Sequence, residues 1–274
     1  MKDRIILVTG ATDGIGKQTA LELARLGATV LLHGRSAERG QQALNDVRAA
    51  TGNDKLDLFL ADLASQKQVR RLAAEVEAKY GRLHVLINNA GVFMPQRQVT
   101  EDGLEMTFAV NHLAPFLLTN LLLDRLKKGA PARIITVSSS LHQRSLVDFN
   151  NLQGDKYYSG GQAYNLSKLG NVLFTVELAQ RLRGSGVTAN CLHPGAIDTK
   201  LLHAAIGRMR GETVAAGAST PVYLAAAPEV EKVTGQYFER RQAVMPSHLA
   251  QDAELRKRFW ETSAQLTGIG QTLT

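Results

Sequence analysis

Tyr164 and Lys168 stand four residues apart, a spacing that places both side chains on one face of a helix. A free phenol has a pKa of about 10, too high for a general base near neutral pH, but a nearby ammonium group favours the phenolate and lowers that pKa. The chain has 6 tyrosines, and only Tyr164 is followed by a lysine four positions later. The pair is therefore a candidate acid–base catalyst for interconverting a hydroxyl and a carbonyl group.

A glycine-rich turn near the N-terminus is a candidate site for the hydride carrier that such a reaction needs. The turn reads Gly10-Ala11-Thr12-Asp13-Gly14-Ile15-Gly16 and lies between an apolar stretch at 4–9 and a stretch with helical periodicity that ends at Gly27. Glycines let the backbone approach a pyrophosphate, and the helix that follows offers free N–H groups to the phosphates. Glycine also serves ordinary turns, but strand, turn and helix in this order predict a dinucleotide-binding unit.

The end of the second predicted strand, at 29–33, bears on the choice of cofactor. An acidic residue there usually binds the ribose 2′-hydroxyl of NAD, whereas an arginine can receive the 2′-phosphate of NADP. The sequence is His33-Gly34-Arg35-Ser36, which has no carboxylate. Arg35 therefore favours NADP(H), the alternative being a solvated loop arginine.

The rest of the chain continues the alternation of strands and helices. Further strands are predicted at 56–61, 85–87, 133–137, 187–192 and, briefly, 236–238. Helices are predicted at 37–51 with Ser36 as the N-cap, at 65–80, at 101–126 with a kink at Pro115, and at 161–183. This order predicts the α/β class: a Rossmann fold with a doubly wound, mostly parallel sheet and helices on both faces. Since no repeat or linker interrupts it, we expect residues 1–274 to form a single domain.

Polar residues and glycines gather where the predicted strands end. They are the turn Gly10 to Gly16, Arg35, Asp62 with Leu63, Asn88-Asn89-Ala90-Gly91, Ser139 and Pro194-Gly195. Ligands of open α/β sheets bind at the carboxyl ends of the strands, whereas core packing would not place such residues at each strand end. We therefore expect them to line one site.

The composition excludes several other classes of protein. The formal net charge is +7, but the basic residues are scattered in short runs such as Arg70-Arg71, so we expect a solvated basic surface and no nucleic-acid partner. No run approaches 18 apolar residues and strand-like sequence begins at Arg4, so we expect neither a transmembrane helix nor a signal peptide. The single cysteine, Cys191, excludes an intrachain disulfide framework and agrees with a cytoplasmic location. We expect no metal site.

Taken together, the motifs resemble those of the short-chain dehydrogenases/reductases. The matches are Thr9-Gly10-x-x-x-Gly14-Ile15-Gly16 for the cofactor turn, Asn88-Asn89-Ala90-Gly91 after the fourth strand, Tyr164-x-x-x-Lys168 for the active site and Pro194-Gly195 after the sixth strand. They follow the family's order from Thr9 to Thr199, a combination far more specific than any one motif. The stretches 110–119, 151–154 and 163–171, with His193-Pro194-Gly195, are similar to the branch that holds retinol dehydrogenases and protochlorophyllide reductases.

The resemblance implies roles for further residues. Ser139 would be the third catalytic group, and Asn111 a fourth that holds a water in a proton relay through Lys168. The implied cofactor contacts are the turn residues, Arg35, Asp62, Leu63, Asn89, Ala90, Gly91, Tyr164, Lys168, Pro194, Gly195 and Thr199. Many NADP-using relatives carry a basic residue where this chain has Asp13, so we expect Arg35 to supply most of the phosphate contact. Many retinol dehydrogenases also carry an apolar anchor ahead of the first strand; here only Met1-Lys2-Asp3 precedes it, so we expect no membrane anchor.

We therefore expect an NADP-dependent oxidoreductase that transfers a hydride between nicotinamide and an apolar carbonyl compound or its alcohol. Tyr164 would donate or take the proton while Ser139 binds the substrate oxygen. The alternatives are an NADPH-dependent reductase of a carbon–carbon double bond and a catalytically silent NADP-sensing protein. At single residues, Ser139 could instead be a turn cap and Asn111 a satisfied buried amide.

The segment after Gly195 is a candidate lid over the substrate. Leu201, Leu202, Ala205, Ile206 and Met209 recur at helical spacing and would form one apolar face. We expect a substrate lid at about 196–217, the alternative being an amphipathic helix packed on the core. The sequence leaves the oligomeric state open, a homo-oligomer included.

Overall fold

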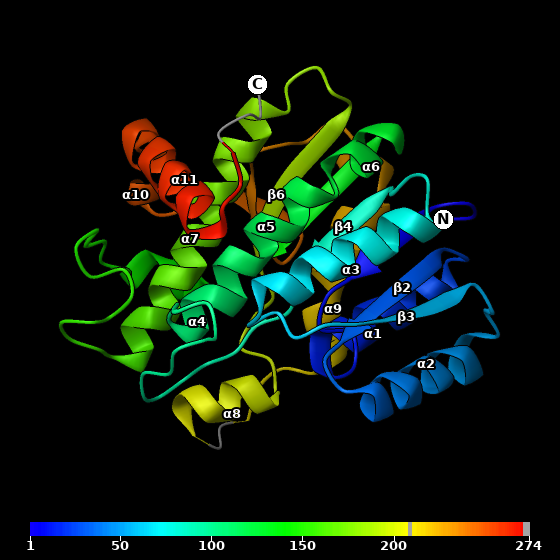
Figure 1. Ribbon diagram of the computed structural model, residues 1–274. Coiled ribbons are helices and arrows are strands. Elements are labelled where there is room, and N and C mark those ends of the chain that lie inside the picture. The colour runs from blue at the N-terminus through cyan, green and yellow to red at the C-terminus, as the bar shows by residue number, and fades with distance from the viewer. Residues whose placement is uncertain (208–209, 271–274) are drawn as a thin grey trace.

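The computed structural model, which describes residues 1–207 and 210–270, is built on one eight-stranded sheet in the order β3-β2-β1-β4-β5-β6-β7-β8 (Figure 1). The strands are β1 (Ile5–Val8), β2 (Thr29–Gly34), β3 (Leu56–Leu60), β4 (Val85–Asn88), β5 (Ala132–Val137), β6 (Val187–His193), β7 (Tyr237–Glu239) and β8 (Gln242–Val244). Strands β1 to β7 are parallel, and β8, which the sequence analysis missed, is antiparallel to β7. The strand order reverses between β1 and β4, which is where open α/β sheets bind ligands.

Helices cover both faces of the sheet, as predicted (Figure 1). One face carries α1 (Gly14–Arg25), α2 (Ala37–Thr51) and α9 (Val214–Ala226), and the other carries α3 (Gln66–Lys79), α5 (Ala114–Leu121) and α7 (Gly160–Arg181). The C-terminal α11 (Ala253–Thr267) packs outside this second layer, against α7 and α5. Successive strand residues point to opposite faces, so Ile6 and Val8 belong to one core cluster and Leu7 to the other.

The remaining elements are short. They are α4 (Met106–Phe108), the π-helical η1 (Ala109–Leu113), α6 (Leu123–Lys128), the 3₁₀ turns η2 (Ser140–Arg144) and η3 (Pro228–Val230), α8 (Lys200–Ile206) and α10 (His248–Gln251). Figure 1 shows α8, in yellow, at the rim of the molecule, apart from the two helical layers. No helix among the described residues has both the length and the apolar character needed to cross a bilayer.

Helix ends confirm the capping predictions. Ser36 precedes α2, and its hydroxyl accepts a hydrogen bond from the Arg39 N–H at 3.4 Å. Gly52, in the left-handed conformation, ends the same helix. The bounds 37–51 predicted for this helix are those observed, because both end signals are local to the chain.

The long helix predicted at 101–126 is wrong in its start and in its continuity. Helix starts at Met106, where the Glu105 carboxylate caps the N–H groups of Thr107 (3.0 Å) and Phe108 (2.7 Å). The stretch then passes through the π-helical η1 before α5 and breaks again at Leu122, ahead of α6. Pro115 lacks an N–H, so the α-helical bond to the carbonyl four residues earlier cannot form. In place of the predicted kink, the helix widens into the π-helical η1 just before Pro115.

Candidate active site

A cavity of about 1250 Å³ lies at the carboxyl ends of the strands and collects nearly all of the predicted site residues. Those that line it are Gly10, Thr12, Asp13, Gly14, Ile15, Gly16, Arg35, Asp62, Leu63, Asn89, Ala90, Gly91, Ser139, Tyr164, Lys168, Pro194, Gly195 and Thr199. Three residues that the sequence analysis placed at the site, Ala11, Asn88 and Asn111, are absent from the wall. The expectation that strand ends meet in one site is confirmed.

The glycine turn leaves no room for side chains between the first strand and the cavity. A Cβ on Gly16 would lie 2.2 Å from the Gly10 carbonyl oxygen, and a Cβ on Gly10 would lie 2.9 Å from the Ala90 Cα. Asn89 secures the turn, because its side-chain amide donates to the Thr9 carbonyl oxygen at 2.8 Å. The N-terminus of α1 thus faces the cavity over bare backbone, which fits a dinucleotide pyrophosphate.

His33, at the end of β2, stabilises the same turn through a hydrogen bond, a role that the sequence analysis missed. Its Nδ1 accepts from the Gly10 N–H at 3.3 Å, so the other nitrogen, Nε2, carries the proton and donates to the Ala61 carbonyl at 3.1 Å. Burial lowers the pKa of His33 to about 4, so the ring stays neutral. A polar residue at the end of an otherwise apolar strand was the available signal.

The entrance on the β2 side carries exposed positive charge. The Arg35 side chain is 76% exposed, and its guanidinium lies 3.7 Å from the Asp62 carboxylate. A Cβ on Gly34 would lie 2.3 Å from the Thr12 Cγ2. No carboxylate side chain fits at position 34 unless Thr12 moves, which agrees with the missing acidic residue.

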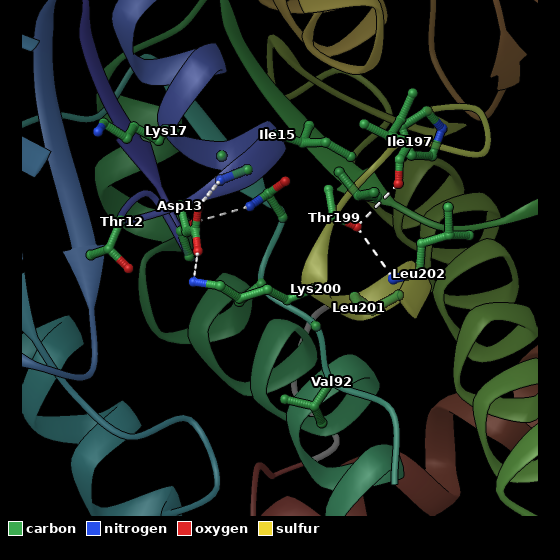
Figure 2. Close-up of a pocket in the computed structure, with 18 of the residues that line it drawn as sticks. Thr12, Asp13, Ile15, Lys17, Val92, Ile197, Thr199, Lys200, Leu201 and Leu202 are labelled. Carbon is green, nitrogen blue, oxygen red and sulfur yellow. Dashed lines mark hydrogen bonds and ion pairs between the residues drawn. The ribbon is translucent and has the colours of Figure 1, made fainter. Parts of the chain in front are cut away.

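The Asp13 carboxylate pairs with two further cations at this entrance, Lys200 and Arg39. Figure 2 shows its carboxylate between α1 and Lys200: it accepts from the Gly14 N–H at 2.9 Å and from the Lys200 Nζ at 2.6 Å. Arg39 Nη2 also contacts it at 3.3 Å. The hydrogen bond from Lys200 is the main cause that lowers the pKa of Asp13. Arg35 is therefore joined by two cations that the sequence analysis did not name; Arg39 was detectable because it lies in the first turn of α2, the helix that begins just after Arg35.

Tyr164, Lys168 and Ser139 lie at the buried end of the cavity. Their exposures are 8%, 3% and 7%. Helix α7 places Lys168 one turn after Tyr164, with its Nζ 5.5 Å from the centre of the tyrosine ring. The ammonium donates to the Val137 carbonyl at 3.0 Å, two residues before Ser139 at the end of β5. The predicted pair and the predicted third group therefore come together.

The pKa of Tyr164 differs from the expectation. Burial raises it to about 12, and a hydrogen bond with the Ser139 side chain opposes that rise only in part. Burial also lowers the pKa of Lys168 to about 8. The expected lowering by the ammonium is outweighed because both groups are desolvated and the ammonium is directed at a backbone carbonyl. Tyr164 is thus a neutral phenol near pH 7, able to donate a proton.

Ser139 and Asn111 make the hydrogen bonds expected from the alternative interpretations, a turn cap for Ser139 and a satisfied buried amide for Asn111. The Ser139 hydroxyl accepts from the Leu141 N–H at 3.2 Å, so it caps η2 as well as facing Tyr164. Asn111 is fully buried: its Oδ1 accepts from the Val92 N–H at 2.7 Å, and its Nδ2 donates to the Val92 carbonyl at 2.9 Å and to the Ser167 hydroxyl at 3.0 Å. The amide of Asn111 is therefore satisfied one layer behind the cavity wall.

Helix α8 turns apolar side chains toward the cavity. Leu201, Leu202 and Ala205 line it, while Met209 lies outside the described residues and the side chain of Ile206 is not described. Thr199 starts the helix, since its Oγ1 accepts from the Leu202 N–H at 3.3 Å and donates to the Ile197 carbonyl at 3.2 Å (Figure 2). Apolar residues of α8 thus line the cavity, together with Lys200 and His203 of the same helix.

The chain matches known proteins along most of its length. The family model described as short chain dehydrogenase matches residues 4–208. Retinol dehydrogenase 11 of Mus musculus is 42% identical, with 97% of this chain and 87% of the relative covered, and retinol dehydrogenase 13 of Homo sapiens is 44% identical, with 97% and 85% covered.

Solved structures agree with these sequence matches. A crystal structure from Mycobacterium paratuberculosis has a TM-score of 0.81 at 34% identity and covers 97% of this chain and 94% of its own. A short chain dehydrogenase from Shigella flexneri, complexed with NADP, has a TM-score of 0.73 at 28% identity, with 88% and 98% covered. The chain belongs to the short chain dehydrogenase family: it is a retinol dehydrogenase-like oxidoreductase that acts on CH–OH and C=O groups and binds a nicotinamide dinucleotide.

Proposed function

We propose that the protein is an NADP(H)-dependent oxidoreductase of apolar carbonyl compounds and the corresponding alcohols. One observation carries this proposal: a single cavity holds Tyr164, Ser139 and Lys168 at its buried end, and the glycine turn with Arg35 at its exposed end. The candidate proton donor and the candidate dinucleotide site therefore lie in the same cavity.

The preference for NADP(H) rests on charge and on space. Arg35, Arg39 and Lys200 bring three cations to the entrance against the two carboxylates of Asp13 and Asp62, and the excess positive charge suits a 2′-phosphate better than a 2′-hydroxyl. A carboxylate at position 34 would clash with the Thr12 side chain unless Thr12 moved. The Shigella flexneri neighbour, which is complexed with NADP, supports the same choice.

The preference for an apolar substrate rests on the apolar part of the cavity wall. Leu201, Leu202, Val92, Met94 and Leu141 line the cavity, and α8 lies at the rim where it would act as a lid over the substrate. An apolar lid excludes water and favours bulky uncharged molecules. Retinol, named in the curated relatives, is an alcohol of this kind.

The residues at the buried end of the cavity transfer the proton to or from the substrate oxygen. When bound, the nicotinamide supplies or takes up the hydride. In the reductive direction Tyr164 donates its proton to the carbonyl oxygen, while the Ser139 hydroxyl stabilises the charge that develops there. The Lys168 ammonium then stabilises the phenolate that remains. The amide of Asn111 is engaged by Val92 and Ser167, so its side chain is not available to hold the water of the expected relay.

The test is NADPH oxidation with a panel of aldehydes, ketones, quinones and compounds with a conjugated carbon–carbon double bond. We expect turnover on apolar aldehydes or ketones, and tighter binding of NADPH than of NADH. Turnover confined to the carbon–carbon double bond would favour the first alternative. Cofactor binding with no turnover in either direction would favour the sensing protein.

A further inference from the structure

We propose that His142 is a positioning residue that holds Ser139 in its catalytic place by linking it to the C-terminal part of the chain. The inference rests on the role of Ser139 in the proposed function. The His142 side chain is fully buried in η2, three residues after Ser139. Its Nδ1 lies 2.7 Å from the Ser139 carbonyl oxygen, and its Nε2 lies 3.0 Å from the Ser247 backbone nitrogen.

These two contacts define the protonation state of the ring. The Ser247 backbone N–H can only donate, so Nε2 must be the unprotonated acceptor. The Ser139 carbonyl can only accept, so Nδ1 must carry the proton. Only the neutral Nδ1–H form satisfies both partners, and burial, which lowers the pKa of His142, favours a neutral ring.

The ring has little freedom to leave this place. It packs against the Tyr237 ring in β7, with 4.7 Å between the ring centres. Ser247 immediately precedes α10 and therefore belongs to a segment about a hundred residues later in the chain. His142 thus joins the end of β5 to the C-terminal elements through a short, rigid side chain.

The contact matters for Ser139 because its hydroxyl and its carbonyl belong to the same small turn. The hydroxyl caps the Leu141 N–H at 3.2 Å, and the carbonyl accepts from the backbone N–H of His142 at 3.1 Å as well as from the ring. A rotation of this turn would carry the hydroxyl away from Tyr164, whose pKa the Ser139 side chain lowers against the effect of burial. The imidazole prevents that rotation by bonding the carbonyl from a ring that Ser247 and Tyr237 hold.

Two substitutions separate the two ends of the bridge. The side-chain amide of asparagine reaches about as far as Nδ1, and that of glutamine about as far as Nε2. H142N therefore keeps a donor for the Ser139 carbonyl, whereas H142Q keeps an acceptor for the Ser247 N–H. If His142 positions Ser139, kcat of H142N stays within about threefold of wild type and kcat of H142Q falls about tenfold or more, since small misplacements of a catalytic group cost this much. The KM for NADPH should be the same in both variants.

A second variant and a control guard against effects on folding. S247P removes the donor N–H and leaves His142 intact, and the φ of −57° at Ser247 suits proline. S247P, like H142N, loses the Ser247 contact and keeps the donor to the Ser139 carbonyl, so we expect its kcat to stay within about threefold of wild type with an unchanged KM for NADPH. H84Q is the control, because His84 also accepts from a backbone N–H, that of Ile5 at 2.9 Å, but just before β4 at the opposite end of the sheet. It should keep the wild-type kcat.

The result that overturns the inference is a kcat of H142Q equal to or above that of H142N when both are folded. Wild-type turnover in S139A would instead remove Ser139 from the proposed function. If wild-type protein turns over no carbonyl, crystal structures of the two variants decide. Displacement of the Ser139 hydroxyl from Tyr164 in H142Q but not in H142N supports the inference, and an unmoved Ser139 in both overturns it.

Discussion

The two ends of the cavity differ in their contact with water, and this difference divides the work of the site. At the buried end, Tyr164 and Lys168 are almost inaccessible, so desolvation sets their pKa values. At the entrance, the side chains of Arg35 and Lys200 are 76% and 82% exposed. Charges at the entrance attract a cofactor while remaining solvated, and groups at the buried end act on a proton in a dry environment. Substitutions at the buried end should therefore change kcat, and those at the entrance should change cofactor affinity.

The largest expected effect belongs to the buried end. Y164F removes the only proton that the tyrosine can donate and should lower kcat at least about 100-fold, while the affinity for NADPH stays near that of wild type. Steady-state turnover and NADPH fluorescence titration measure the two quantities. Y157F, at an exposed tyrosine before α7, is the matched control. Near-normal turnover of Y164F would remove Tyr164 as the donor.

At the entrance, R35A should weaken NADPH binding about ten- to thirtyfold through loss of a charge-assisted contact with the 2′-phosphate. The affinity for NADH, which lacks this phosphate, should not change, and kcat at saturating NADPH should stay the same. Titration of both cofactors against wild type and variant checks this. The cofactor assignment is wrong if wild type already binds NADH as tightly as NADPH.

The pH dependence tests the protonation of Lys168, whose pKa is lowered to about 8. A lysine is charged below its pKa, so kcat for carbonyl reduction should be flat below about pH 7 and fall as the ammonium loses its proton, about twofold at pH 8 and about fourfold at pH 8.5. K168R keeps its charge at these pH values. If K168R retains measurable turnover, its profile should stay flat to higher pH. An unchanged decline in K168R would assign that decline to another group.

The smallest expected effect concerns the lid. In a series of aldehydes of rising chain length, each added methylene should raise kcat/KM about two- to fourfold in wild type, because apolar surface is buried under α8. L201S/L202S should lower this gain per methylene. L146S, at a leucine that is 74% exposed and outside the cavity, should leave it unchanged. Parallel series in wild type and L201S/L202S, or a preference for small charged substrates, would contradict the lid.

Local signals were sufficient for most of the fold. The positions of β1 to β7 along the chain and the bounds of α2 follow from strand periodicity, turn glycines and helix caps, all of which act within a few residues. The prediction failed where the local signal is weak. The helix at Met106 is capped by Glu105, which is not one of the usual N-cap residue types, and β8 is a three-residue strand that pairs with β7 across a two-residue turn.

The same division holds for the site. The sequence by itself determined which residues gather at the carboxyl ends of the strands, because alternating strands and helices place those ends on one edge. Only the tertiary structure decided that the pKa of Tyr164 rises. The Lys168 ammonium was expected to lower it, but burial has the larger effect, and desolvation depends on every group packed around the phenol. The tertiary structure alone also brings Lys200 to Asp13 across 187 positions and Ser247 to His142 across 105, separations at which no sequence pattern records contact.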